Sequence, residues 1–188
     1  MIAPIELGYQ LGKNPEDYGG TYKIGGYYDT SAASSLADPA VFDTGRQGLY
    51  LEAAQQTYKW GRDQRSGLAL FGIFTASDQN TAKFKHYYEA GAASRGVFPG
   101  RELDILSFGW VRTDINPRFQ FQMASAGKPI QTSEQLVELT YTIQVLHLCS
   151  FGLPDKFNPS CQLPSRVSLR SAARFASSGN RGPEGRTD

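Results

Sequence analysis

The sequence predicts an all-β protein folded as an antiparallel, up-and-down meander. Seven stretches of about ten residues alternate apolar and polar side chains, which is the two-residue period of a β-strand. Clusters of Gly, Asn, Asp and Pro separate these stretches and are typical of turns. No helical period lies between them, so each strand is expected to pair with the next one as a hairpin.

The first three predicted strands each separate an apolar face from a polar one. They cover residues 5–10, 20–31 and 48–60. Successive side chains of a strand point to opposite faces of the sheet, so alternate positions share a face. The apolar positions are Ile5, Leu7, Tyr9, Tyr22, Ile24, Tyr28, Leu49, Leu51 and Ala53, and the opposite positions are Glu6, Gln10, Lys23, Tyr27, Asp29, Tyr50, Glu52 and Gln56.

The last four predicted strands continue this pattern with one exception. Residues 67–77 are apolar on both faces, and alternation does not assign their two sides. The strands at 85–95, 103–113 and 134–145 alternate again. Their apolar positions are Tyr88, Ala90, Ala92, Leu106, Phe108, Trp110, Leu139, Tyr141, Ile143 and Val145, opposite Lys85, Tyr87, Glu89, Arg95, Ser107, Gly109, Thr113, Glu138, Thr140, Thr142 and Gln144.

A soluble sandwich or jelly roll and a membrane β-barrel both fit this outline. The strands are long, since about 9–11 tilted residues cross a bilayer and an ordinary strand has about 5–6. Long loops after residues 31 and 114 contrast with shorter turns at 61–66 and 96–102, as in outer-membrane barrels. Aromatic residues near strand ends fit interface girdles, namely Tyr27, Tyr28, Tyr58, Trp60, Tyr87, Tyr88 and Trp110. These features favour the barrel.

Composition excludes some functions. The 19 basic and 18 acidic residues balance, which argues against nucleic-acid binding. No apolar stretch is long enough for a transmembrane helix, and no signal peptide is visible at the start of this sequence.

The polar positions include candidate pore-lining residues that would hydrogen-bond sugar hydroxyls or stack against sugar rings. They are Lys23, Tyr27, Glu52, Gln56, Tyr87, Glu89, Arg95, Glu138 and Gln144. Any one of the charged residues is also explained by solvation of a polar sheet face. Tyr27 and Tyr87 are also explained as girdle residues, and a one-residue slip of register would exchange each with its aromatic neighbour.

No pattern for catalysis or metal binding accompanies these residues. His86 and His147 stand alone, without the spacing of a zinc site. No nucleophile and base are brought together by the sequence, so neither an enzyme nor a cofactor is expected.

Several segments together resemble the carbohydrate-selective porin family of Gram-negative outer membranes, the OprB type. They are "GGTYKIGGYYDTS", "RQGLYLEAAQQTYKW", "GLALFGIFTAS", "YYEAGAASRGVFPGRELDILSFGWVRTDIN" and "VELTYTIQV". Their order and continuity carry the resemblance, and they cover most of residues 5–145. The resemblance implies a partial transmembrane β-barrel, about seven strands from the C-terminal half of a sixteen-stranded parent. It also implies outer-membrane lipid, sugars and small solutes as partners, with a trimeric parent left open.

The composition changes after residue 146. Residues 147–188 are rich in Ser, Arg and Pro, hold both cysteines and show no alternation that continues the series. A shifted reading frame would produce such a change. We therefore expect a partial porin barrel over 1–146 and a disordered, non-family tail over 147–188. No packed context in that tail indicates a disulfide between Cys149 and Cys161.

The function expected from the sequence is a fragment of an outer-membrane porin for passive diffusion of sugars, not functional alone. The alternative is a soluble all-β carbohydrate-binding module. Dependence on detergent separates the two, because only the porin fragment should need it. A barrel-type outer-membrane enzyme is a third class, which the lack of a catalytic constellation argues against.

Overall fold

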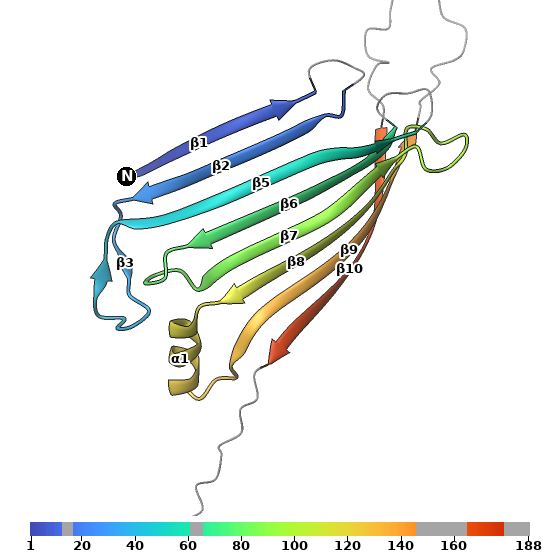
Figure 1. Cartoon of the computed structure of the whole chain (residues 1–188). Helices are drawn as coiled ribbons and strands as arrows, with labels where there is room; N and C mark the ends of the chain where they lie inside the picture. Colours follow the sequence, from blue (N-terminus) through green and yellow to red (C-terminus); the bar gives the residue numbers. More distant parts are fainter. Residues whose placement is uncertain (13–16, 61–65, 146–164, 179–188) are drawn as a thin grey trace, which may run out of the picture.

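The computed structural model describes residues 1–12, 17–60, 66–145 and 165–178. They form a single antiparallel eight-stranded sheet whose neighbours follow chain order, together with a small hairpin in one loop (Figure 1). The sheet strands are β1 (Ile2–Leu11), β2 (Gly20–Asp29), β5 (Arg46–Lys59), β6 (Gly67–Ser77), β7 (Phe84–Arg95), β8 (Ile105–Ile115), β9 (Gln131–Val145) and β10 (Ser165–Ser178). The predicted all-β meander is confirmed, and all seven predicted strands are present.

The strand β10 corrects the expectation that the tail supplies no strand. Residues 165–178 pair with β9 along most of its length. This segment has its own two-residue period, because apolar residues recur at alternate positions among Arg and Ser. They are Val167, Leu169, Ala173 and Phe175. Both cysteines and His147 lie outside the described residues.

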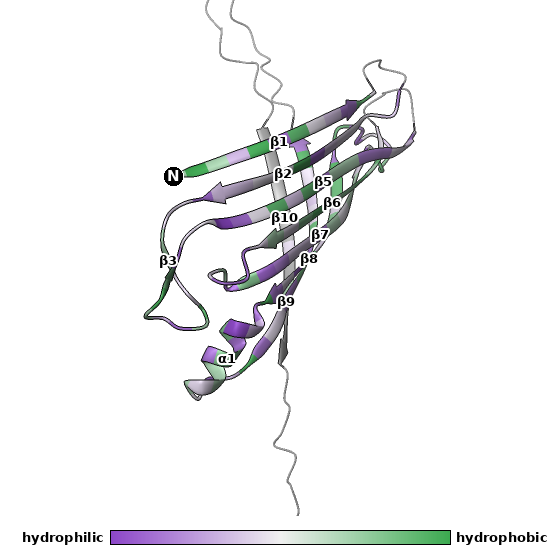
Figure 2. Cartoon of the chain, turned by 60° about the vertical axis from the view of Figure 1, so that its left-hand side comes forward, coloured by the Kyte–Doolittle hydropathy of each residue, from purple (hydrophilic) through white to green (hydrophobic). Residues whose placement is uncertain are grey.

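Strand register divides the sheet into two chemically different faces. Residues directly opposite one another on antiparallel strands have their side chains on the same face. One row runs from Gly8 through Lys23, Glu52, Ile73, Glu89 and Val111 to Leu136. The face that holds this row is called the polar face below, and the face that holds Ile24, Leu51, Phe74 and Leu139 is called the apolar face. Figure 2 shows hydrophilic and hydrophobic residues alternating along the strands.

The apolar face has no second layer over it in the part of the chain that the structure describes. Ile5 and Leu7 are 74% and 71% exposed on this face. Among the described residues, the buried hydrophobic side chains are Leu36 and Ile115 alone. The sheet therefore lacks the apolar core that a soluble sandwich builds between its two sheets.

The longer connections lie together at one end of the sheet (Figure 1). The β2–β5 connection contains β3 (Ala33–Ser34) and β4 (Phe42–Asp43), and the β8–β9 connection contains α1 (Pro117–Ser125). Both occur where long loops were predicted, but α1 was not predicted. Its start is encoded by Asn116 as N-cap followed by Pro117. Because α1 buries no residue, the sequence has no apolar stripe at helical spacing that would predict it.

These connections pack against one another through hydrogen bonds. The Asn116 side chain is buried, and its amide donates to the carbonyls of Gln79 and Ala82 at 2.9 Å each. Leu36 N–H donates to the Asn80 carbonyl at 2.7 Å, and the Gln122 amide donates to the Leu36 carbonyl at 2.7 Å. The β2–β5 loop, the β6–β7 turn and α1 thus form one hydrogen-bonded cluster.

Candidate functional site

The nine predicted pore-lining residues all fall on the polar face. Strand register puts the following side chains on this one face of the sheet: Lys23, Tyr27, Glu52, Gln56, Tyr87, Glu89, Arg95, Glu138 and Gln144. They extend from Tyr27, toward the end with the long connections, to Gln144 at the opposite end. The register also decides between neighbouring aromatics, since Tyr28 and Tyr88 lie on the apolar face.

Charged side chains at mid-height on the polar face neutralise one another. Lys23 Nζ lies 3.9 Å from Glu6 Oε1 and 3.9 Å from Glu52 Oε2, so one cation serves two carboxylates. The Tyr50 hydroxyl donates a hydrogen bond to Glu6. All three charged side chains are more than a third exposed or close to it, so water screens these ion pairs.

Two further carboxylates are held by hydroxyl groups from their own strands. The Tyr87 hydroxyl donates to Glu89 Oε2 at 2.5 Å, and the Thr140 hydroxyl donates to Glu138 Oε1 at 2.8 Å. Residues two apart on a strand share a face, so these bonds run along the polar face. Each bond fixes the direction in which its carboxylate points.

Three aromatic rings on the polar face lie over glycines of the adjacent strand. Tyr27 is paired with Gly48, Tyr50 with Gly25 and Phe71 with Gly91. A Cβ built on these glycines would come within 2.3–2.5 Å of the ring carbons. Each glycine therefore leaves the space in which a ring lies close against the backbone.

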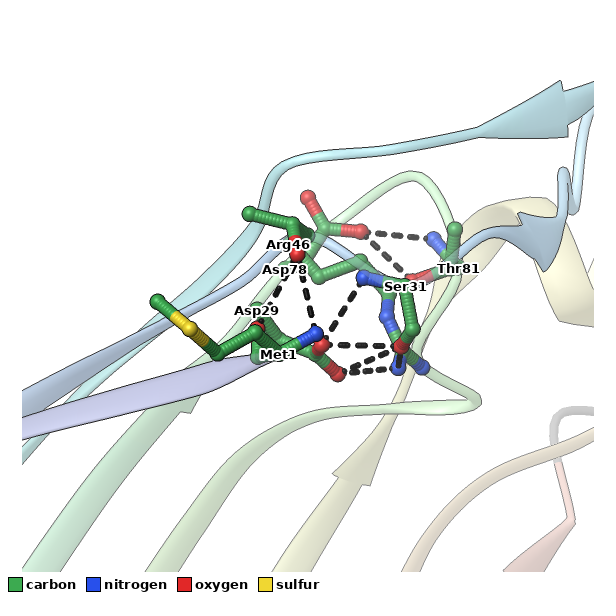
Figure 3. Close-up of polar contacts among 7 residues, drawn as sticks. Met1, Asp29, Ser31, Arg46, Asp78 and Thr81 are labelled. Atoms are coloured by element: carbon green, nitrogen blue, oxygen red, sulfur yellow. Dashed lines mark hydrogen bonds and ion pairs between the residues drawn. The ribbon is translucent and has the colours of Figure 1, made fainter.

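The polar face carries an arginine at each of its two ends. At the end with the long connections, Arg46 Nη2 contacts Asp29 and donates to Ser31 Oγ at 2.7 Å (Figure 3). At the opposite end, Gln56 and Arg95 border a hollow of about 340 Å³. The two ends are thus both polar and both occupied by an arginine.

Asp104 anchors the β7–β8 turn to the end of β9. It accepts hydrogen bonds from the Tyr141 hydroxyl at 2.5 Å, Gln144 N–H at 2.9 Å and Arg101 Nε at 2.7 Å. Its side chain is only 3% exposed. The bond from Tyr141, with those from Gln144 and Arg101, holds the pKa of Asp104 below its usual value of 3.8.

The apolar face carries aromatic residues at mid-height as well as toward its two ends. Tyr28 lies near the end of β2 that leads into the long connections. Closer to mid-height, the rings of Phe74 and Tyr88 lie 5.3 Å apart, and Trp110 Nε1 donates to Gln135 at 3.1 Å. Toward the opposite end, the rings of Tyr58 and Trp60 lie 5.8 Å apart. Aromatic side chains with one polar atom suit a boundary between an apolar and a wet environment.

The polar face also holds residues outside the nine candidates. Alternation placed Glu6, Tyr50 and Thr140 on this face, but they were not among the candidate pore-lining residues. Glu6 contacts Lys23, Thr140 donates to Glu138, and Tyr50 donates to Glu6. Phe71, which lies over Gly91, was not assigned to either face. Phe71 had no local signal, because residues 67–77 are apolar on both sides and only their pairing assigns them.

Other classes of site have no counterpart in the described part of the chain. No group of three or more His, Cys, Asp or Glu residues is arranged to hold a metal ion there. None of the helices in those residues combines the length and apolar character needed to cross a membrane.

Comparison with known proteins identifies this architecture. The profile of the carbohydrate-selective porin, OprB family, matches residues 1–148. The chain belongs to the carbohydrate-selective porin family. Porin B of Pseudomonas aeruginosa is 26% identical over 171 residues, covering 77% of this chain and 37% of Porin B. A putative porin of Acinetobacter baylyi, QuiX, is 24% identical over 140 residues, covering 66% of this chain and 32% of QuiX.

A solved structure of a family member agrees with the fold. The high-pH structure of Pseudomonas putida OprB superposes with a TM-score of 0.69 at 26% identity, over 76% of this chain and 39% of that one. The chain thus spans about a third to two fifths of the length of these porins. Because the family match ends at residue 148, β10 lies beyond it.

Proposed function

We propose that the chain forms part of the wall of an outer-membrane channel that passes sugars and small solutes by diffusion. One observation carries the proposal. Eight adjacent strands place all nine predicted polar residues on one face and leave the opposite, apolar face uncovered. Such one-sided alternation is what a transmembrane barrel needs between lipid and a watery interior.

In this arrangement the two faces have different partners. The apolar face contacts the hydrocarbon of the outer membrane, and its terminal aromatics lie at the two interfaces. The polar face lines the lumen, where Lys23, Glu52, Glu89 and Glu138 offer hydrogen-bonding groups to sugar hydroxyls. Selectivity then depends on pore width and on these lining groups. Conduction requires no reaction, cofactor or nucleic acid, so the chain acts as a channel wall and not as an enzyme.

The proposed channel needs further strands. In the described sheet β1 and β10 each pair on one side only. Within a bilayer an unpaired edge is costly, because no water satisfies its N–H and C=O groups. The term completed barrel is used below for the full chain refolded together with the strands of Porin B that have no counterpart in this chain.

Liposome swelling tests this function directly. The completed barrel should admit a monosaccharide such as glucose, with a rate proportional to the amount of protein inserted. Liposomes refolded with the Porin B strands alone provide the control. If the full chain stays soluble and monomeric without detergent, and adds no sugar permeability to the Porin B strands, the proposal is wrong.

A further inference from the structure

A small hollow on the polar face is the starting point. It has a volume of about 180 Å³ and lies across four adjacent strands, β6 to β9, at mid-height of the sheet. Its lining includes Phe71, Glu89, Gly109, Val111, Glu138 and Thr140. Strand pairing sets the relative positions of these lining residues, because Gly109 on β8 pairs with Gly91 on β7 and with Glu138 on β9.

The floor of the hollow is open because of one glycine. A Cβ built on Gly109 would meet no atom within 4 Å, so the space above it is free. On the next strand, a Cβ on Gly91 would lie 2.3 Å from Phe71 Cζ and 2.5 Å from the Phe108 carbonyl oxygen. The tip of the Phe71 ring therefore crosses over β7 toward the hollow, and the paired glycines Gly91 and Gly109 have opposite roles.

Two oriented carboxylates complete the walls. Glu89 is held by the Tyr87 hydroxyl and Glu138 by the Thr140 hydroxyl. They come from β7 and β9, on either side of the strand that carries Gly109. The hollow thus combines one aromatic ring, one bare stretch of backbone and two fixed acceptors.

We propose that this hollow is a subsite for one neutral pyranose ring. The C–H groups on one face of such a ring are attracted to the electron-rich face of an aromatic ring. Its equatorial hydroxyls donate to carboxylates, which are strong acceptors. Phe71 serves as the platform, Glu89 and Glu138 receive the hydroxyls, and Gly109 provides the room. This assignment rests on the proposed channel function and names where on the wall a sugar pauses.

Equilibrium binding to the completed barrel in detergent tests the subsite. Saturation-transfer NMR with methyl α-glucoside as probe is compared with sorbitol, which has similar hydroxyls but no flat ring. We expect the glucoside to bind more tightly than sorbitol. Phe71→Ala and Gly109→Val should each weaken glucoside binding by about two- to tenfold, through loss of the platform and filling of the hollow.

Matched variants on the apolar face separate the subsite from general damage. Leu139→Val and Gly72→Ala alter the same region of the sheet on its other side, and both should bind the glucoside like the parent. Phe71→Leu keeps apolar volume but removes the aromatic face, so it should resemble Phe71→Ala. Glu138→Gln keeps the shape of the wall and should weaken binding less than Gly109→Val.

The possible results distinguish the subsite from the channel. If Phe71→Ala and Gly109→Val bind the glucoside unchanged while liposomes still take up glucose, the subsite is refuted and the channel stands. If Ca²⁺ binds and displaces the glucoside, and Glu138→Gln abolishes both effects, the two carboxylates form a cation site and the proposal fails. Absence of sugar uptake by the completed barrel refutes the channel function itself.

Discussion

The two faces of the sheet are made by the same strands, yet they are stabilised in opposite ways. On the polar face the charged groups have partners within the sheet, as Lys23 does between Glu6 and Glu52. On the apolar face, Ile24 and Leu139 are 54% and 51% exposed with nothing packed over them. A soluble sheet buries its apolar face against a second layer. This sheet therefore requires its surroundings to supply the apolar contact.

Closure of the barrel should have the largest effect on channel formation, because only a closed barrel lets the polar face enclose a lumen. The full chain alone should give no stable, sugar-blockable channels in a planar bilayer, whereas the completed barrel should. Each unpaired backbone group at an edge costs several kcal/mol in lipid. The described sheet has eight strands, an even number as in closed bacterial barrels, so the expectation rests on its two unpaired edges.

The expectation survives even if β1 and β10 were to pair. An eight-stranded barrel has an interior just wide enough for its own side chains, which leaves no room for a sugar. Single-channel recording of the chain with and without the Porin B strands makes the comparison. Sugar-blockable channels from residues 1–188 alone would contradict it and would indicate closure by several copies.

A charge on the apolar face tests the assignment of the faces most directly. Leu139→Arg should destabilise the completed barrel in liposomes by about 2–4 kcal/mol, the cost of Arg or Lys near the bilayer midplane. Thr140→Arg, at the adjacent position on the polar face, should cost much less. Urea titration of folding into vesicles measures both. Equal losses for the two variants would remove the distinction between the faces.

The sequence predicted the two faces of the sheet better than it predicted the loops. Alternation placed Lys23, Glu52 and Glu138 correctly because a strand's period fixes parity without any knowledge of its partners. It failed for Phe71, whose strand is apolar on both sides, so only pairing with β5 and β7 assigns its face. Composition also hid β10, since Ser and Arg between apolar residues were interpreted as disorder.

The loop cluster lay beyond prediction for a different physical reason. Asn116 bonds to Gln79 and Ala82, more than thirty positions earlier in the chain. Such contacts follow from which connections end on the same side of the sheet, and a local pattern does not encode them. The hollow above Gly109 is equally non-local, because four strands build it.

The paired glycines of the polar face should respond differently to the same substitution. Gly91→Ala places a Cβ 2.3 Å from Phe71 and 2.5 Å from a carbonyl oxygen, and we expect overpacking to cost about 1–3 kcal/mol. Gly109→Ala meets open space and should be neutral or slightly stabilising, since glycine weakens a strand. Denaturant titration of the two variants in the same vesicles compares them. A larger loss for Gly109→Ala would mean that Phe71 does not lie over Gly91.

Asp104 should make the stability of the β7–β8 turn depend on pH. Its pKa is lowered in the folded state, so its contribution to stability is complete above its usual, unfolded value of 3.8. That contribution is lost as the pH falls through the lowered folded pKa. Asp104→Asn should lower the stability near neutral pH, because the hydrogen bonds to the carboxylate are weakened, and should remove this acid transition.

Trp60 reports on this turn, because its Nε1 donates to the Gly96 carbonyl at 2.9 Å and Gly96 N–H donates to the Asp104 carbonyl at 3.0 Å. With Trp110→Phe as background, Trp60 fluorescence in the completed barrel should change below about pH 4 in the parent but not in Asp104→Asn. An identical acid transition in both proteins would assign it to another carboxylate.

The smallest effect is expected where the polar face is most exposed. Lys23→Met removes two ion pairs at 3.9 Å between groups that are about a third or more exposed, so stability should fall by no more than about 1 kcal/mol. Selectivity should change more than stability, because Glu6 and Glu52 lose the cation between them and the lumen becomes more negative. The ratio of cation to anion permeability in a salt gradient should therefore rise, and rise more at low ionic strength, where screening is weakest. Lys59→Met, outside this carboxylate cluster, is the matched control. If the ratio stays constant while stability falls by several kcal/mol, Lys23 would be a structural residue of the wall and the polar face would not face an ion-accessible lumen at that height.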